Sequence, residues 1–320
     1  MKLLRYTAVL VGLSCCGMLV AAIATAHAPV DRESIWSIAV ATVDTPFELN
    51  EEVASLPPSI TSADVTDVQA RFVADPFMVR HEGRWVMFFE VLNDATDQGD
   101  IGYATSCDGK EWNYQRIVLD EPFHLSYPSV FEYDGEFYMV PESEAADSVR
   151  LYRATAFPSE WEYERTLIVG ADLADPTIIQ HDGGWFMFVG KPDTHDQLRL
   201  FVSNDLAGVW DEHPSSPLVE RNPRVSRPAG AVIVADGKIY RLAQDCSERY
   251  GQAVLAFEIT QLSQDRYEEA EHPITLLTAQ TNRWNSYGMH HLHAVRTSDG
   301  RWMYCVDGHR KKLVWAWNRD

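Results

Sequence analysis

Two aspartates and a glutamate have the types and positions that acid–base chemistry needs. Asp75 and Asp175 each stand directly before a proline at the start of an apolar run, and Glu142 ends another such run. Proline disfavours helical backbone in the preceding residue, so we expect both aspartates in extended chain at strand starts. Glycoside hydrolysis uses paired carboxyl groups, one as acid and the other as base or nucleophile. The alternative is that each aspartate only caps a turn.

The strands that must position these groups belong to a sequence repeat that occurs five times. Each copy has an apolar run, an Asp-Gly or Glu-Gly turn, and a second run rich in aromatic residues. The copies follow one another at intervals of about 50 residues, and each reads as a hairpin with period-two alternation. We therefore expect an all-β fold, a five-bladed β-propeller.

One strand of the ring should come from the start of the chain. The fifth unit has three strand-like runs, over residues 291–296, 301–306 and 313–317, and lacks a fourth. Proteins avoid an open sheet edge. We expect residues 35–43 to supply the missing outer strand, pair with 313–317 and close the ring. Residues 51–70 should then cross back to the axis as a loop.

An antiparallel meander brings inner-strand starts, second-strand ends and third-strand starts to one face of the ring. In chain order the inner strands start at Asp75, Tyr127, Asp175, Arg227 and His290 or His291; the second strands end at Glu90, Glu142, Lys191, Asp245 and Asp307; and the third strands open at Asp100, Arg150, Arg199 and Gln252. We expect an axial funnel richer in charge than a solvated rim requires. The substrate-binding candidates are His124, Tyr127, Arg150, Arg227, Asp245, Trp284, His290 and His291.

The histidines near the fifth inner strand have several possible roles. Strand alternation directs His291 and His293 one way and His290 the other. Such a side chain could contact a substrate hydroxyl, hold a structural cation near His290 or His291, or be a satisfied core residue. No Cys or Glu lies at the spacing of a zinc ligand. We expect no cofactor.

Residues 1–28 have the pattern of an export signal. Lys2 and Arg5 precede an apolar run over residues 6–26, and Ala26-His27-Ala28 gives a small-x-small cleavage site. The run is also about long enough to remain uncleaved as a membrane anchor. We expect a periplasmic or extracellular protein, or one anchored through residues 6–26, with a single propeller domain over residues 29–320.

Composition excludes several other classes of protein. The formal net charge is -20, which argues against binding nucleic acid or an anionic membrane surface. Beyond residue 28 only Cys107, Cys246 and Cys305 remain, so at most one disulfide can form within the chain. A framework held together by disulfides is therefore excluded.

Two family resemblances follow from these motifs. The paired Asp-Pro phrases resemble those of the five-bladed propeller glycoside hydrolases of families 43, 32 and 68. From about residue 36 to residue 308, the chain is similar to the N-terminal domain of plant glucosamine inositolphosphorylceramide transferase and its stand-alone bacterial relatives. The matching phrases are Val73-Ala74-Asp75-Pro76-Phe77, Leu119-Asp120-Glu121-Pro122-Phe123-His124-Leu125-Ser126-Tyr127-Pro128, Pro141-Glu142-Ser143, Arg150-Leu151-Tyr152, Arg227-Pro228-Ala229-Gly230, Gln244-Asp245-Cys246 and Met289-His290-His291.

The hydrolase resemblance implies roles for individual residues. It implies that Asp75 is base or nucleophile and that Asp175 tunes or stabilises. It also implies a general-acid glutamate at the inner strand of blade four, where this chain instead has Arg227. Glu142 or Asp245 would then be the substitute acid, or no acid is present.

The two resemblances together imply a carbohydrate-active propeller. We expect a hydrolase-like protein that acts on a glycan or glycoconjugate, with Glu142 as its acid. In the plant proteins a glycosyltransferase domain follows this region, so a glycosyltransferase is an expected partner. The alternative is a glycan-binding or accessory module of a glycosyltransferase system, which keeps the funnel without turnover.

Overall fold

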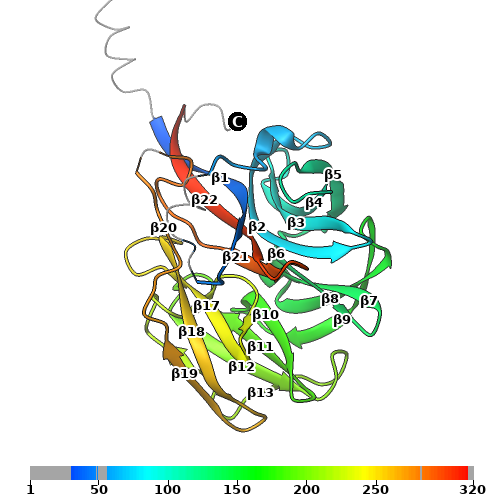
Figure 1. Ribbon diagram of the computed structural model, residues 1–320, viewed down its shortest axis with the longest axis vertical. Coiled ribbons are helices and arrows are strands. Elements are labelled where there is room, and N and C mark those ends of the chain that lie inside the picture. Colours follow the sequence, from blue (N-terminus) through cyan, green and yellow to red (C-terminus); the bar gives the residue numbers. More distant parts are fainter. Residues whose placement is uncertain (1–29, 48, 50–55, 282, 316–320) are drawn as a thin grey trace, which may run out of the picture. The chain divides into compact units, whose positions relative to one another are not determined.

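The computed structural model describes residues 30–47, 49, 56–281 and 283–315 (Figure 1). They divide into two compact units, one of residues 30–34 and 311–315 and the other of Ile35–Arg310. The fold and the site described below belong to the larger unit. The predicted export segment over residues 1–28 lies outside the described residues, within which no helix is long and apolar enough to span a membrane.

Five antiparallel sheets form the blades of a five-bladed β-propeller, which confirms the predicted fold. Blade one contains β2 (Ala70–His81), β3 (Arg84–Asn93), β4 (Gln98–Ser106) and β5 (Asn113–Leu119); blade two contains β6 (Ser126–Tyr133), β7 (Glu136–Glu142), β8 (Ser148–Ala156) and β9 (Glu160–Val169). Blade three contains β10 (Ala174–His181), β11 (Gly184–Gly190), β12 (Gln197–Ser203), β13 (Asp211–Glu212) and β14 (Val219–Glu220). Blade four contains β15 (Arg227–Pro228), β16 (Ile233–Ala235), β17 (Lys238–Asp245), β18 (Ala253–Leu262), β19 (Tyr267–Glu271) and β20 (Leu277–Thr278), and blade five contains β21 (Leu292–Arg296), β22 (Trp302–Trp315) and β1 (Val30–Val43). Two short 3-10 turns, η1 (Ser62–Asp64) and η2 (Glu144–Ala146), are the only helical elements in the described part of the chain.

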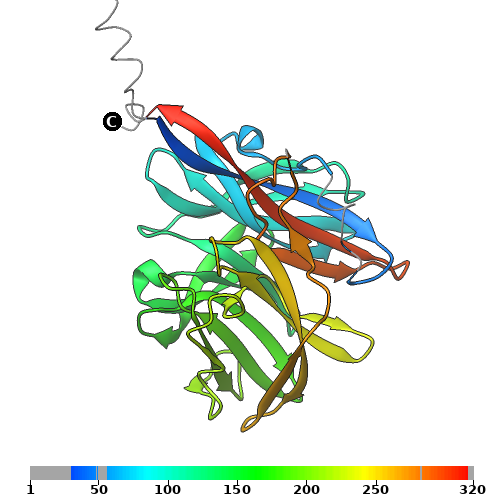
Figure 2. The same ribbon diagram turned by 90° about the vertical axis from the view of Figure 1, so that its left-hand side faces the viewer.

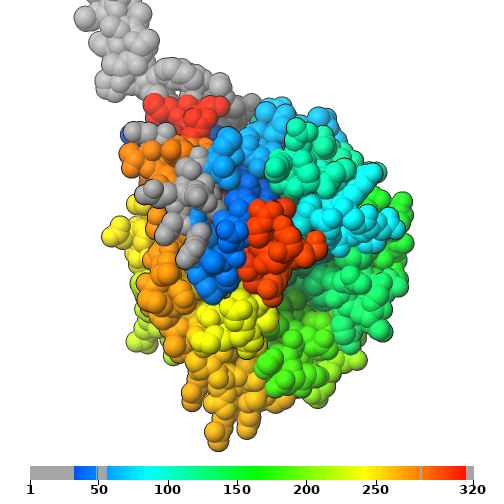
Figure 3. Space-filling view, viewed as in Figure 1, coloured from blue at the N-terminus to red at the C-terminus, as the bar shows by residue number. Residues whose placement is uncertain are grey.

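The N-terminal strand completes blade five. β1 pairs with β22, and β22 pairs with β21. Figure 2 shows β1 and β22 side by side. On the surface, the blue N-terminal segment lies beside the orange-red strands of blade five (Figure 3). Inside the blade, Trp36 of β1 stacks on His309 of β22 with 3.9 Å between ring centroids. The prediction that residues 35–43 close the ring is therefore confirmed.

The strand that pairs with the closing strand is longer than predicted. Over its described residues the run predicted at 313–317 is no separate strand, because β22 continues unbroken from Trp302 to Trp315. Gly308 lies inside this strand. A Cβ atom there would stand 2.6 Å from the Cβ of Asn285 and 2.8 Å from the ring of Trp284. This glycine allows a close approach and does not form a turn.

Four of the five repeated turns have the geometry that favours a tight hairpin. Glu82, Asp134, Asp182 and Asp236 have φ between 46° and 52°, and the glycine after each has φ between 74° and 80°. Positive φ at both central residues defines the type I′ turn, whose twist matches that of the flanking strands. The Asp-Gly and Glu-Gly pairs therefore fix the register of the hairpins.

Three inner strands contain a bulge. Asp75, Tyr127 and Asp175 have φ of 52°, 47° and 50°, and each lies where the pairing with the next strand shifts register. The expectation of extended backbone before proline was therefore wrong at Asp75 and Asp175, because the bulge needs a left-handed residue at that point. A non-glycine residue in this region costs on the order of 1–3 kcal/mol, and such strain is often found at functional sites.

The core lies mostly between neighbouring blades. Phe77 and Phe88 of blade one pack with Tyr127, Val130 and Met139 of blade two in one buried cluster. Cys107, Cys246 and Cys305 are all free, so the blades are held by packing and not by a disulfide.

Candidate functional site

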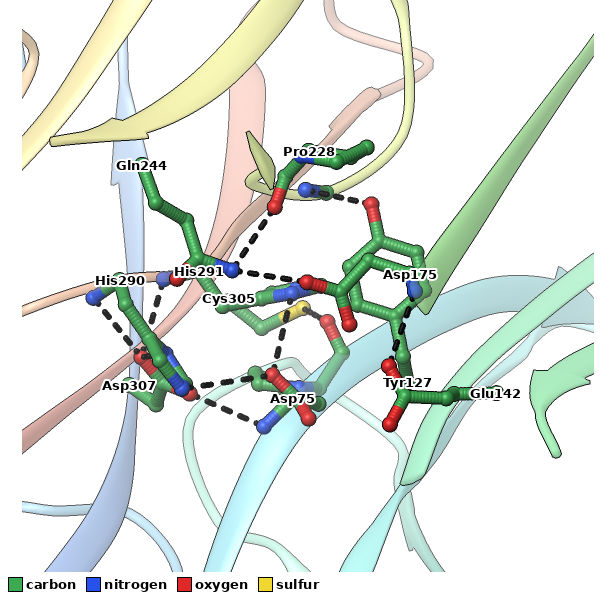
Figure 4. A network of polar contacts seen from close by, with 12 residues as sticks. Asp75, Tyr127, Glu142, Asp175, Pro228, Gln244, His290, His291, Cys305 and Asp307 are labelled. Atoms are coloured by element: carbon green, nitrogen blue, oxygen red, sulfur yellow. Dashed lines mark hydrogen bonds and ion pairs between the residues drawn. The ribbon is translucent and has the colours of Figure 1, made fainter. Parts of the chain in front are cut away.

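Carboxyl groups from four blades lie on inner and second strands. They are Asp75 and Glu90 of blade one, Glu142 of blade two, Asp175 of blade three and Asp307 of blade five. The predicted strand ends were wrong at three of them, because β2 begins before Asp75, β3 continues past Glu90 and β22 continues past Asp307. Burial first, and then the charges of the other four carboxyl groups, raise the pKa of Glu90 well above its ordinary value. We call these five residues, together with Arg227, His290 and His291, the central cluster. Figure 4 shows six of its members, which are Asp75, Glu142, Asp175, His290, His291 and Asp307.

Arg227 of β15 forms the ion pair on one side of the central cluster. Its Nε donates to Asp175 Oδ2 at 2.6 Å, and its Nη2 lies 3.4 Å from Glu142 Oε2. Gln244 donates from Nε2 to the same Asp175 oxygen at 2.9 Å (Figure 4). Burial opposes the charge on Asp175, but the Arg227 guanidinium holds the pKa of that carboxyl below its ordinary value. Asp175 therefore remains ionised at neutral pH.

His290 and Asp307 form the opposite side. Asp307 accepts the backbone N–H groups of Asp75, His290 and His291 at 3.0, 3.2 and 3.0 Å. Its Oδ1 also lies 2.8 Å from His290 Nδ1. Burial works against the charge on Asp307, but His290 and these donors lower its pKa. The ring of His290 stacks on Trp36, with 4.0 Å between centroids, so the closing strand contacts the site directly.

Asp75 lies between these two groups. Its Oδ1 is 3.8 Å from His290 Nε2 and 3.6 Å from His291 Nδ1. Burial raises the pKa of Asp75 to about 7, the charge of His290 opposes the rise, and the charges of Asp307 and Asp175 add to it. Asp75 therefore exchanges its proton near neutral pH, unlike Asp175.

Glu142 also holds its proton more tightly than an ordinary glutamate. Its Oε2 accepts the backbone N–H of Asp175 at 2.9 Å, which ties blade two to blade three. Burial raises the pKa of Glu142 to about 8, and the charge of Asp175 acts in the same direction. Arg227 acts in the opposite direction.

His291 is fully buried and uncharged at neutral pH. Burial lowers its pKa to about 4. Neither ring nitrogen of His291 makes a hydrogen bond within the described residues.

Asp75, His290 and Asp307 each offer one atom, all within 4.8 Å of one another, and could together hold a cation. A structural cation near His290 or His291 stays a prediction.

Two more of the predicted residues border the central cluster. His124 lies beside Glu90, with 3.4 Å between His124 Nε2 and Glu90 Oε1. Tyr127 is fully buried, and its hydroxyl accepts the N–H of Gly230 at 2.7 Å and lies 2.6 Å from Thr177 Oγ1. The geometry gives Tyr127 a structural role, because its hydroxyl joins blades two, three and four.

Three predicted residues lie elsewhere in the described structure. Arg150 sits over the ring of Phe123, 4.6 Å from its centroid. Asp245 accepts hydrogen bonds from Ser247 and lines a separate cavity of about 350 Å³. Trp284 donates its Nε1 proton to the Leu56 carbonyl at 2.7 Å and packs on the core. The position of Arg150 follows from the topology of the blade, because third strands start further from the axis than inner and second strands.

Several residues of the site were not assigned from sequence. Gln244 contacts Asp175 where its neighbour Asp245 had been expected, and strand alternation explains the difference, because adjacent residues face opposite sides. Glu90 and Asp307 were among the predicted second-strand ends without an assigned role. Tyr250, which lies under the Arg227 guanidinium at 5.3 Å, is in a loop with no strand pattern to place it.

Known sequences match almost the whole described chain. The family model described as "Glucosamine inositolphosphorylceramide transferase 1, N-terminal" matches residues 28–309. Proteins called glucosamine inositolphosphorylceramide transferase 1 are 35% identical over 303 residues in Oryza sativa subsp. japonica and 36% over 304 residues in Arabidopsis thaliana. Both alignments cover 88% of this chain, and they cover 41% and 40% of the relatives. The chain thus spans about two fifths of the length of these curated relatives.

Solved structures share the fold at low sequence identity. The catalytic domain of a GH62 α-L-arabinofuranosidase from Coprinopsis cinerea aligns with a TM-score of 0.57 and 13% identity, over 86% of this chain and 96% of that chain. An exo-1,5-α-L-arabinanase from a bovine ruminal metagenomic library aligns with a TM-score of 0.56 and 16% identity, over 78% and 93%. These likenesses concern the propeller alone.

Proposed function

The chain belongs to the family of glucosamine inositolphosphorylceramide transferase 1 N-terminal domains, and on that premise we propose that its propeller binds a glycan or glycoconjugate at the central cluster and hydrolyses a glycosidic bond there. Asp75 acts as base or nucleophile, and Asp175 stabilises the positive charge that develops on the sugar ring. The proton donor is one of the two glutamates with a raised pKa, Glu142 or Glu90.

One observation carries this proposal: neighbouring carboxyl groups with opposite proton affinities. The pKa of Asp75 is raised to about 7, mainly by burial, whereas Arg227 overcomes burial to lower that of Asp175. A base is most effective when its pKa lies near the working pH. Environments that push the pKa values of neighbouring carboxyl groups apart give those groups different roles, here an exchangeable base at Asp75 and a permanent negative charge at Asp175.

A second candidate function is glycan binding without turnover. Arg227 stands at the inner-strand start of blade four, where the hydrolase resemblance implied an acidic residue, and it occupies Asp175 and Glu142. An arginine and several carboxylates can bind sugar hydroxyls without any proton transfer. In this case the domain would be an accessory module of a glycosyltransferase system.

The cellular setting belongs to the same proposal. The names of the curated relatives join glucosamine and inositolphosphorylceramide with the word transferase. A glycosyltransferase that acts on a glycoconjugate of this class would be the partner. Residues 1–28 would export the domain or anchor it through residues 6–26.

The test compares binding and cleavage for the same ligand. Glycan arrays and chromogenic glycosides, screened with the full chain, identify a ligand for titration calorimetry and turnover assays. The Asp75→Asn variant should lose at least about 1,000-fold in turnover and keep its affinity within about tenfold, because the base acts only in the transition state. Asp175→Asn and Glu142→Gln are measured alongside, and Glu258→Gln, a surface residue paired with Lys238, is the control.

The opposite pattern would support the binding module. A wild type that binds but never cleaves any recognised glycan, with Asp75→Asn binding about tenfold to a hundredfold more weakly, would show that the carboxylate is only a hydrogen-bond acceptor.

A further inference from the structure

We propose that Glu90 is the general acid of the central cluster and that His124 is the positioning residue that stabilises its anion. This inference rests on the proposed hydrolytic function and names the proton donor that the function leaves open.

Glu90 lies inside β3, the strand next to the one that carries Asp75. It pairs across the sheet with Ala74, the residue before Asp75, so both carboxyl groups leave blade one at the same level. The side chain of Glu90 is 7% exposed. A carboxyl group at this position faces the same ligand as the base does.

The partners of the five carboxyl groups separate Glu90 from the others. Asp175 has Arg227 and Gln244, and Asp307 has backbone N–H groups and His290. Glu142 has the Asp175 N–H and Arg227. Asp75 has His290, whose positive charge lowers the pKa of Asp75. Among the described residues, the one polar contact of the Glu90 carboxyl is with the neutral His124. Donors and cations favour the ionised form of a carboxyl group, so Glu90 is the group best placed to stay protonated.

The charged groups that face Glu90 act in the same direction. Asp75 on β2, Glu142 on β7, Asp307 on β22 and Asp175 on β10 each disfavour a further negative charge on Glu90, in addition to its burial. His124 does not compensate for them, because burial lowers its own pKa and leaves it neutral at pH 7.

The backbone fixes the tautomer of His124. The N–H of Gly99 donates to His124 Nδ1 at 2.9 Å, so Nδ1 carries the lone pair and Nε2 carries the proton. That Nε2–H lies 3.4 Å from Glu90 Oε1, too far for a strong hydrogen bond. The contact can tighten once Glu90 becomes an anion.

Glycine is required at position 99 for this arrangement. A Cβ atom there would lie 2.3 Å from the Leu125 carbonyl oxygen, 2.8 Å from His124 Cε1 and 2.9 Å from Glu90 Oε1. Any larger residue would separate the loop that carries His124 from the strand that carries Glu90. The contact between His124 and Glu90 is therefore part of the packing between blades one and two.

The proton balance of the reaction is closed. Glu90 gives its proton to the glycosidic oxygen as the bond from that oxygen to the anomeric carbon breaks, and the leaving group departs as an alcohol. A water oxygen bonds to the anomeric carbon and loses a proton to Asp75. The net change is the addition of one water molecule, after which Asp75 releases a proton to solvent and Glu90 takes one from it. His124 Nε2–H stabilises the Glu90 carboxylate between these steps.

The test has a spectroscopic arm and a kinetic arm. Carbon-13 NMR of the full chain with labelled glutamate carboxyl groups, with Glu90→Gln used for assignment, should show Glu90 protonated at pH 7. Aryl glycosides of differing leaving-group acidity should show that Glu90→Gln loses at least about 100-fold in kcat/KM on poor leaving groups and less than about tenfold on activated ones, since an activated group departs without a proton. Glu258→Gln is again the control.

His124→Asn separates positioning from structure. The asparagine side-chain oxygen can still accept the Gly99 N–H, but no N–H remains for Glu90. The alkaline limb of the pH–rate profile should therefore shift to higher pH, because the Glu90 anion has lost its donor. An unchanged limb would refute the role of His124.

The remaining outcomes refute different statements. An ionised Glu90 at pH 7 together with cleavage, or leaving-group dependence in Glu142→Gln in place of Glu90→Gln, overturns the acid role of Glu90 alone. A wild type that cleaves no glycoside although Glu90 keeps its proton overturns hydrolysis itself, and with it the acid role.

Discussion

Replacing Arg227 with methionine should destabilise the propeller more than any comparable change at the surface. The arginine side chain is 9% exposed and that of Asp175 is 3% exposed, with 2.6 Å between Nε and Oδ2. Methionine keeps the apolar part of the side chain but leaves the buried negative charge of Asp175 without its ion-pair partner. Removing one partner of a buried ion pair costs about 3–5 kcal/mol.

That cost is large enough to measure directly. For a domain of this size, 1 kcal/mol shifts the melting temperature by about 2–4 °C, so Arg227→Met should melt about 6–20 °C below the wild type. Scanning calorimetry or circular dichroism at pH 7 measures the shift. The double variant Arg227→Met/Asp175→Asn should recover much of the loss, because its stranded charge is gone.

A second arginine provides the matched control. Arg199 pairs with Glu212 at 2.7 Å, but the two side chains are 28% and 41% exposed. An exposed pair contributes about 0–1 kcal/mol, so Arg199→Met should shift the melting temperature by only a few degrees. Equal shifts for Arg227→Met and Arg199→Met, or a double variant no more stable than Arg227→Met, would refute the reasoning.

Two further predictions concern pH and ring closure. The free energy of unfolding should rise as the pH falls from about 8 to about 6.5. The pKa values of Asp75 and Glu142 are about 7 and about 8 in the folded protein, and their ordinary values are 3.8 and 4.5. In this pH window the folded protein therefore binds protons that the unfolded chain does not bind. Urea midpoints across that window measure the effect, Glu142→Gln should reduce it, and a flat or opposite trend would contradict it. Trp36→Ala should cost about 3–5 kcal/mol, because it removes a buried indole from between His290 and His309. A thermal melt within 2–4 °C of the wild type, equivalent to about 1 kcal/mol, would show that the closing strand contributes little there.

Much of the fold could be predicted because its signals are local. The Asp-Gly and Glu-Gly pairs mark each blade without reference to the rest of the chain, and in four of the five blades they adopt the left-handed conformations that a tight hairpin needs. The closing strand was also predictable, since a ring with a missing strand leaves an unpaired edge.

The site was harder to predict because it depends on counting residues along strands. A bulge adds one residue, so alternation counted from the turn fails beyond it, as the left-handed Asp75 and Asp175 show. One position also separates Gln244, which faces Asp175, from Asp245, which does not. Arg150 and Trp284 were misplaced because only tertiary packing determines which polar groups reach the axis.

The left-handed backbone at Asp75 and Asp175 has a consequence for the evolution of the family. Glycine adopts this backbone without strain, so at these two positions the loss of the side chain would be partly offset by a more favourable backbone. A single base change converts either aspartate codon into a glycine codon. Lineages that no longer use the site should therefore drift towards glycine first at position 75, because glycine at position 175 would also leave the buried Arg227 without its nearest ion-pair partner. Among genomes, glycine at position 75 would distinguish copies that no longer use the site from those that do.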